Sequence, residues 1–217
     1  MKPLIKVCGN TRLDNISSLV KEPFVPDYLG FIACKGSKRI VDFRVLEEFI
    51  CAAPSRIKTA LVFCGNELSD LQGVTCLSGI SAIQFHNNQS AKFMKDCRKV
   101  FVGEFIKVFS VSDDFDFSSC LEFEEVSDFF LFDTGISGTK ISGGTGSTFN
   151  WDRLKDYKST RPYFLAGGIG PDDVTRIKNL AKEQVMLLGI DINSRFETAP
   201  GLKDTELVKR FIEEIRR

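Results

Sequence analysis

The chain has 217 residues, of which 43% are hydrophobic, and this is enough to close the core of one large domain or two small ones and excludes a disordered chain. Its 29 Lys and Arg residues equal its 29 Asp and Glu residues, so no bulk charge attracts nucleic acid or an anionic membrane surface. Because no signal peptide precedes the first apolar run, and no apolar run approaches the length of a membrane helix, we expect a cytoplasmic protein.

Short runs of apolar, β-branched or aromatic residues recur along the chain and predict β-strands. Eight such runs cover residues 4–8, 28–33, 58–63, 81–85, 104–109, 129–133, 163–167 and 185–190. Strands that are apolar throughout are typical of a parallel sheet that is covered on both faces.

Helical spacing of apolar residues follows several of these strands. The helices predicted from it cover residues 13–21, 42–53, 171–181 and 204–216. Helices after the third, fourth and fifth strands are poorly signalled, because Gly73 interrupts one and residues 112–120 look more like a loop. We infer these helices from the rhythm of the other units.

Eight strands that alternate with helices, without a low-complexity linker, favour one α/β domain over residues 1–217. We predict a (βα)8 TIM barrel, a closed ring of eight parallel strands in which some helices are short or irregular. Functional residues of such a barrel gather where the strands end, at its carboxyl face.

Reactive side chains stand at four of the predicted strand ends: Cys8, His86, Asp133 and Asp191. A thiol and a carboxyl group that face each other could act as base and acid, if nearby cations lower the pKa of Cys8 and burial raises the pKa of Asp133. As an alternative to catalysis, Cys8 could simply pack in the core, and Asp133 could cap a helix or accept a loop hydrogen bond. The lone His86 is either a hydrogen-bonded structural residue or a ligand contact.

Glycine-rich stretches at residues 165–173 and 188–197 follow the last two strands, where barrels often bind phosphate through loop amides. The long aperiodic stretch 134–151 is typical of a functional loop. Together they predict a small phosphorylated ligand, although single Gly-Gly pairs mostly mark turns. Arg39 follows the second strand and could hold a carboxylate through two hydrogen bonds, unless its loop is only a solvated surface.

The seven cysteines form no C-x-x-C pair and have no histidine at the spacing of metal ligands. The sequence therefore predicts neither a disulfide framework nor a zinc site. Most of these cysteines should be small buried hydrophobes in a reducing compartment, with Cys8 as the candidate exception.

The segments KVCGNTR, IQFH, LFDT, GGTGSTFNW, LAGGI and GIDINSRFE occur in this order and resemble the phosphoribosylanthranilate isomerase family of tryptophan biosynthesis. The resemblance covers essentially the whole chain. It implies a (βα)8 barrel that catalyses the Amadori rearrangement of N-(5-phosphoribosyl)anthranilate to 1-(2-carboxyphenylamino)-1-deoxyribulose 5-phosphate. This reaction moves protons and implies neither a metal nor another cofactor.

The resemblance also implies roles for single residues. Asp133 matches the acid that protonates the furanose oxygen, Cys8 matches the base that removes the C2′ proton, and Arg39 matches the arginine that holds the anthranilate carboxylate. The residues that fall on the IQFH segment or on the phosphate and ribose-binding loops are His86, Gly144, Gly168, Asp191, Asn193 and Ser194. Lys38 replaces the proline that is common before this arginine, so the loop lacks the rigidity of a proline.

Two other interpretations stay open. The related isomerase of histidine synthesis performs the same rearrangement on a different amine, but it relies on a pair of aspartates, and the combination of Cys8 and Asp133 argues against it. A catalytically idle barrel would keep the phosphate loops and lose the acid or the base, and here both are present. We expect a monomer that works either alone or beside the next enzyme of the pathway.

Overall fold

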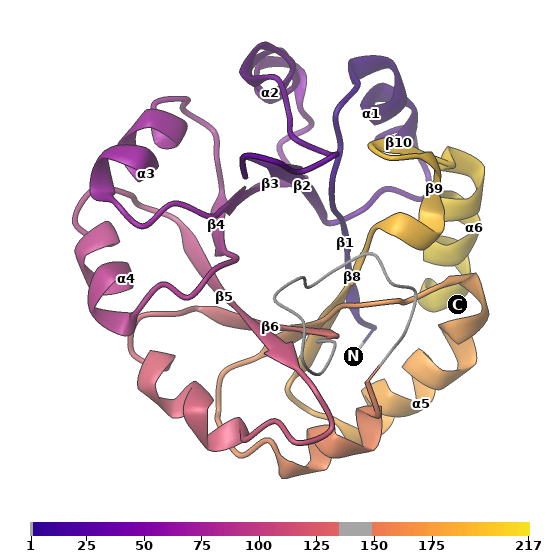
Figure 1. Ribbon diagram of the computed structural model, residues 1–217. Helices are drawn as coiled ribbons and strands as arrows, with labels where there is room; N and C mark the ends of the chain where they lie inside the picture. The colour runs from indigo at the N-terminus through magenta and orange to yellow at the C-terminus, as the bar shows by residue number, and fades with distance from the viewer. Residues whose placement is uncertain (1, 135–148) are drawn as a thin grey trace.

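The computed structural model describes residues 2–134 and 149–217, and its main feature is a closed ring of eight parallel strands (Figure 1). The strands are β1 (Leu4–Val7), β2 (Tyr28–Ile32), β3 (Lys58–Phe63), β4 (Ala82–Phe85), β5 (Glu104–Val111), β6 (Phe129–Thr134), β7 (Tyr163–Leu165) and β8 (Leu187–Ile192). They pair in chain order, and the ring closes where β1 pairs with β8, with Lys6 opposite Asp191. The predicted parallel barrel is confirmed.

Helices surround the ring on its outside (Figure 1). The helices predicted after β1, β2, β7 and β8 are α1 (Leu13–Leu19), α2 (Phe43–Ala52), α5 (Val174–Glu183) and α6 (Thr205–Arg216). Those inferred from rhythm alone after β3 and β4 are α3 (Leu68–Thr75) and α4 (Ala91–Cys97). Gly73 lies inside α3, where an exposed glycine costs only about 1 kcal/mol.

Short 3-10 helices complete the outer layer and confirm that some helices are irregular. They are η1 (Phe117–Phe123), η2 (Trp151–Asp156), η3 (Pro171–Asp173) and η4 (Ser194–Phe196). The segment that was expected to be a loop after β5 is therefore partly helical, because the Asp116 side chain accepts a hydrogen bond from the Ser118 backbone N–H and caps η1. None of the helices among the described residues has both the length and the apolar character needed to span a membrane.

The apolar side chains form two layers, as a parallel barrel requires. One set fills the interior of the ring and consists of Tyr28, Ala60, Ala82, Ile106, Leu131, Phe164 and Ala166. The other set packs the outer face of the strands against the helices; α6 contributes Val208, Phe211, Ile212 and Ile215 to it. Because successive residues of a strand point to opposite sides, both layers draw on the same strands.

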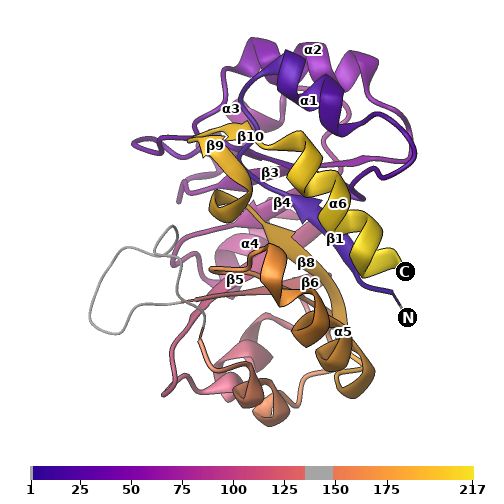
Figure 2. The same ribbon diagram turned by 90° about the vertical axis from the view of Figure 1, so that its right-hand side faces the viewer.

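A small antiparallel hairpin, β9 (Glu197–Ala199) and β10 (Leu202–Lys203), follows β8 and lies near α1 at one end of the barrel (Figure 2). Thr11 Oγ1 donates a hydrogen bond to the Gly201 carbonyl oxygen at 3.0 Å. Asn15 Oδ1 accepts one from the Lys203 backbone N–H at 2.9 Å. These bonds fix the hairpin over the carboxyl end of β1.

Candidate active site

A cavity of about 300 Å³ opens at the carboxyl ends of the strands. The predicted site residues that line it are Cys8, Arg39, His86, Asp133, Gly168, Asp191, Asn193 and Ser194. Gly144, the remaining predicted site residue, lies outside the described residues. The barrel thus brings to one place candidates that are spread over almost the whole sequence.

Asp133 lies near the end of β6 and lines the cavity, where the residue is 9% exposed. Burial raises the pKa of its carboxyl group and the nearby Asp191 raises it further, while His86 and Lys6 oppose the rise. A carboxyl group with a raised pKa keeps its proton closer to neutral pH, which is what a general acid needs.

Cys8 directly follows β1, and its backbone N–H donates a hydrogen bond to the Ile192 carbonyl oxygen at 2.9 Å. The residue is 5% exposed. Burial raises the pKa of the thiol and Asp191 adds to the rise, whereas Lys6 and Lys203 lower it. The two expected cations are present, but burial outweighs them and the pKa of Cys8 lies above its usual value.

A buried ion pair lies beside Cys8 in the barrel interior. Lys6 Nζ is 2.9 Å from Asp191 Oδ2, and the two residues stand opposite each other on β1 and β8. Burial raises the pKa of Asp191, and Lys6 opposes this rise. We did not single out Lys6 from the sequence, although it precedes Cys8 by two residues, and the period of a strand places both side chains on one face.

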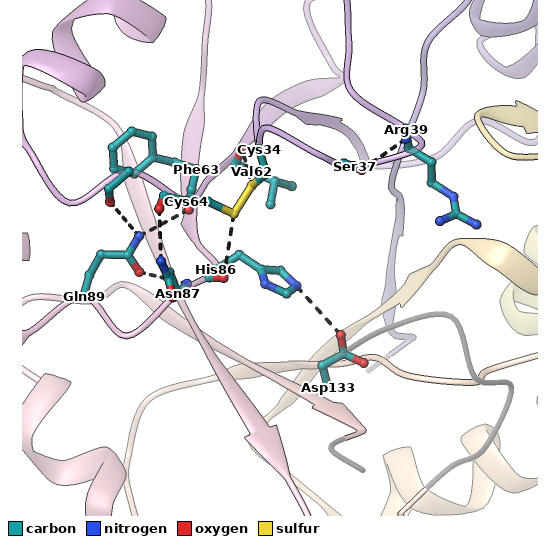
Figure 3. Close-up of a disulfide and its surroundings, with 11 residues drawn as sticks. Cys34, Ser37, Arg39, Val62, Phe63, Cys64, His86, Asn87, Gln89 and Asp133 are labelled. Atoms are coloured by element: carbon teal, nitrogen blue, oxygen red, sulfur yellow. Dashed lines mark hydrogen bonds and ion pairs between the residues drawn. A yellow bond between two sulfur atoms is a disulfide. The ribbon is translucent and has the colours of Figure 1, made fainter. Parts of the chain in front are cut away.

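His86 directly follows β4, and its backbone N–H donates a hydrogen bond to the Phe63 carbonyl oxygen at 2.9 Å. Its imidazole is directed at Asp133, as Figure 3 shows, with Nε2 3.9 Å from Asp133 Oδ2. The only histidine of the chain is therefore a cavity residue as well as a hydrogen-bonded one.

Arg39 reaches the cavity from the loop after β2, and Glu197 of β9 fixes its guanidinium group. Arg39 Nη2 and Nε donate to Glu197 Oε2 at 2.7 and 2.9 Å. The Arg39 backbone N–H also donates to Ser37 Oγ at 3.1 Å. These contacts hold the arginine although Lys38 stands where a proline would stiffen the loop.

Lys203 of β10 completes this cluster and was likewise missed from the sequence. Its Nζ donates to Glu197 Oε1 at 2.7 Å and to Asn193 Oδ1 at 2.6 Å. The hairpin after β8 brings Glu197 and Lys203 into contact with the cavity residues Arg39 and Asn193. Its strands of two and three residues give too little periodicity to be predicted.

The glycine-rich loops after β7 and β8 lie side by side at the cavity. Gly167 and Gly168 have φ values of 84° and 66°, a left-handed backbone that glycine adopts without strain. A Cβ atom on Gly167 would lie 2.3 Å from the Thr134 backbone nitrogen, so no side chain fits there. Arg195, next to Ser194, donates a hydrogen bond to the Gly168 carbonyl oxygen at 3.3 Å and joins the two loops.

The prediction about cysteines is wrong for Cys34 and Cys64, which form a disulfide at the cavity wall (Figure 3). Ile32 and Val62 pair across β2 and β3, so the residues two positions further on meet at the same edge, with a Cα–Cα distance of 5.3 Å. A spacing of 30 residues carries no sequence signature for this contact. The free cysteines are Cys8, Cys97 and Cys120, which are buried, and Cys51 and Cys76, which are exposed, contrary to expectation.

Among residues 2–134 and 149–217, no group of three or more His, Cys, Asp or Glu side chains is arranged to hold a metal ion. Two charged residues of the cavity pair with residues behind its wall: Asp191 with Lys6, and Arg39 with Glu197. Such a site can bind an anion and move protons between a thiol and a carboxyl group.

Residues 5–214 match the family model of N-(5'-phosphoribosyl)anthranilate (PRA) isomerase. The chain is 35% identical to the N-(5'-phosphoribosyl)anthranilate isomerase of Phocaeicola vulgatus, and the alignment covers 98% of each chain. The crystal structure of phosphoribosyl anthranilate isomerase from Thermus thermophilus has the same fold, with a TM-score of 0.82, 20% identity and 98% of each chain covered. A further such isomerase, in complex with reduced 1-(o-carboxyphenylamino)-1-deoxyribulose 5-phosphate, has a TM-score of 0.80 and 22% identity, with 99% of this chain and 98% of that chain covered. The chain therefore belongs to the N-(5'-phosphoribosyl)anthranilate isomerase family.

Proposed function

We propose that Asp133 and Cys8 act as general acid and general base in the Amadori rearrangement of N-(5-phosphoribosyl)anthranilate to 1-(2-carboxyphenylamino)-1-deoxyribulose 5-phosphate. Membership of the family makes the protein an isomerase of tryptophan biosynthesis. The observation that carries the assignment of roles is that these two side chains line one cavity and have different surroundings: Asp133 is buried beside His86, and Cys8 lies beside two lysines.

In the first step Asp133 donates its proton to the furanose ring oxygen. The bond between this oxygen and C1′ breaks, and the lone pair of the anthranilate nitrogen forms a C=N double bond, which gives a protonated Schiff base. Burial supports this role of Asp133, because it favours the neutral carboxyl group before the step.

In the second step the Cys8 thiolate removes the proton from C2′. The electrons of this C–H bond form a double bond between C1′ and C2′, and those of the C=N bond return to nitrogen, which gives an enolamine. The enolamine tautomerises to the aminoketone product. Cys8 then releases the proton it took and Asp133 regains one, by exchange with solvent, so both groups return to their starting states. No electrons enter or leave, so acid-base groups suffice for the whole reaction.

The remaining cavity residues are assigned to binding. Arg39 is proposed to hold the anthranilate carboxylate through its planar guanidinium group, which Glu197 already orients. The residues proposed to contact the ribose or the phosphate are His86, Gly144, Gly168, Asp191, Asn193 and Ser194. The glycine backbone after β7 lets N–H groups approach phosphate oxygens closely.

The deciding experiment is a steady-state assay of the purified protein, in which the fluorescence of N-(5-phosphoribosyl)anthranilate falls as it is consumed. The aminoaldose phosphate of histidine synthesis is tested in parallel. Turnover of the anthranilate compound supports the proposal; turnover of the histidine precursor alone, or of neither compound, rejects it. Cys51→Ser serves as the matched control for Cys8→Ser, because Cys51 is an exposed free cysteine on α2.

We further propose that residues 1–217 act as one catalytic domain, that the protein is cytoplasmic, and that it works as a monomer. Light scattering of the purified chain tests the last point, since the chain has a mass of 24.3 kDa and a dimer would double this value. Association with the next enzyme of the pathway would appear as a larger species only when both proteins are mixed.

A further inference from the structure

We propose that Lys6 is a positioning residue that stabilises the thiolate form of Cys8. The inference rests on the proposed role of Cys8 as the base. Lys6 acts through Cys8 and Asp191, and it is not among the residues that line the cavity.

The geometry places the lysine and the thiol in one enclosed space. Lys6 is 0% exposed, and its side chain lies on the same face of β1 as Cys8. A Cβ atom on Gly30 of the neighbouring strand would lie 2.8 Å from Cys8 Sγ and 3.1 Å from Lys6 Nζ. The ammonium group and the sulfur therefore both lie against Gly30, where no side chain separates them.

The hydrogen bonds of Lys6 leave it capacity for a second anion. An ammonium group has three N–H donors, and Asp191 Oδ2 accepts one of them at 2.9 Å. Asp191 already compensates the charge of this buried lysine, and a Cys8 thiolate is the second anion to which the remaining N–H groups can donate. Lys6 opposes the rise that burial causes in the pKa of Cys8, and Cys8 in turn raises the pKa of Lys6.

The surrounding charges also balance with a thiolate. The groups around the sulfur are Lys6 of β1, Asp191 of β8, Lys203 of β10 with its partners Glu197 and Arg39, and Asp133 and His86 across the cavity. With Asp133 and His86 uncharged, three cations face three anions when Cys8 is ionised. When Cys8 is a thiol, one cation has no counterpart.

The test is the pH dependence of Cys8 alkylation by iodoacetamide, followed by mass spectrometry of the Cys8 peptide in the ligand-free enzyme. Lys6→Met should raise the midpoint by about one pH unit or more, and should lower kcat at pH 7 by about tenfold or more with little change in KM. Lys6→Arg keeps the charge and should stay closer to the wild-type midpoint. An unchanged midpoint in Lys6→Met would overturn the proposal.

Lys107→Met is the matched control. Lys107 is also a buried strand lysine, 4% exposed, but it lies on the outer side of β5, where its Nζ is 5.1 Å from the centre of the Phe123 ring. Its removal should leave the Cys8 midpoint unchanged. An equal rise in this variant would overturn the proposal, because any lost buried lysine would then have the same effect.

If Lys6→Met does not fold, Lys6→Gln replaces it, because glutamine keeps a polar side chain without the charge. The Cys8 midpoint should rise in this variant as well, and a midpoint at the wild-type value overturns the proposal. Failure of the proposed function is a separate result. A wild-type protein that does not isomerise its substrate, but in which Lys6→Met raises the midpoint, refutes the function of Cys8 and retains the role of Lys6.

Discussion

Reduction of the disulfide between Cys34 and Cys64 is expected to lower the stability of the protein. The two cysteines are 30 residues apart, and the chain-entropy relation gives about 3.5 kcal/mol at 25 °C for a closed loop of this length. In a chain of 217 residues, 1 kcal/mol corresponds to about 2–4 °C in Tm. The Tm should therefore fall by about 10 °C when the bond is reduced.

The assay is thermal unfolding followed by circular dichroism, with and without a phosphine reductant. The double variant Cys34→Ser/Cys64→Ser should have the Tm of the reduced protein and should not respond to reductant. The matched control Cys51→Ser/Cys76→Ser removes two exposed free cysteines and should keep the full response. Titration of the unfolded, unreduced chain should find five thiols among its seven cysteines. Seven thiols, or a Tm that reductant leaves unchanged, would refute this reasoning.

The same bond has an expected effect on the site. It ties the loop after β2 to the loop after β3, and the first of these loops carries Arg39. Because Arg39 is assigned to the anthranilate carboxylate and not to the reacting atoms, loosening its loop should raise KM more than it lowers kcat. A reduced enzyme in which kcat falls and KM is unchanged would contradict that assignment.

Three further changes test single contacts. Glu197→Gln removes the charge that orients Arg39 and should raise KM for the anthranilate substrate about tenfold with a smaller change in kcat; an unchanged KM in the steady-state assay would contradict this. Gly30→Ala places a carbon 2.8 Å from Cys8 Sγ and should lower the free energy of unfolding by about 1–3 kcal/mol in urea titrations, together with kcat. Asp133→Asn should raise the Tm near pH 8, because the pKa of the buried carboxyl group is raised and its ionised form therefore destabilises the fold. This gain in Tm should vanish as the pH falls below about 4, where the carboxyl group is protonated in the folded and the unfolded chain. A gain that persists at that pH would rule out the carboxylate as its cause.

The barrel could be predicted because its strands are short apolar runs at regular intervals, and such runs are what a buried parallel strand requires. The weaker predictions concerned the connections. The segment after β5 has polar residues and no helical period, so η1 depends on the cap by Asp116 and on burial of Phe117 and Cys120, which only the folded chain reveals.

The cavity residues could be predicted from their positions at strand ends, because the carboxyl ends of all eight strands lie at the same face of a barrel. Pairs of side chains could not be predicted in the same way. The contact between Lys6 and Asp191 depends on the closing register of β1 and β8, and that between Arg39 and Glu197 depends on the hairpin after β8. A strand of two residues is too short to show a pattern in one sequence, and the pairing of β1 with β8 joins segments at opposite ends of the chain.

The most direct test of the central claim compares turnover and binding in the wild-type protein, Asp133→Asn and Cys8→Ser. Each preparation is assayed for kcat with N-(5-phosphoribosyl)anthranilate and for the Kd of reduced 1-(o-carboxyphenylamino)-1-deoxyribulose 5-phosphate. If Asp133 and Cys8 act as acid and base on one bound substrate, kcat should fall by about 100-fold or more in each variant. The Kd should stay within about threefold of the wild-type value. Near-normal turnover in either variant, or a loss of binding that equals the loss of turnover, would contradict the claim.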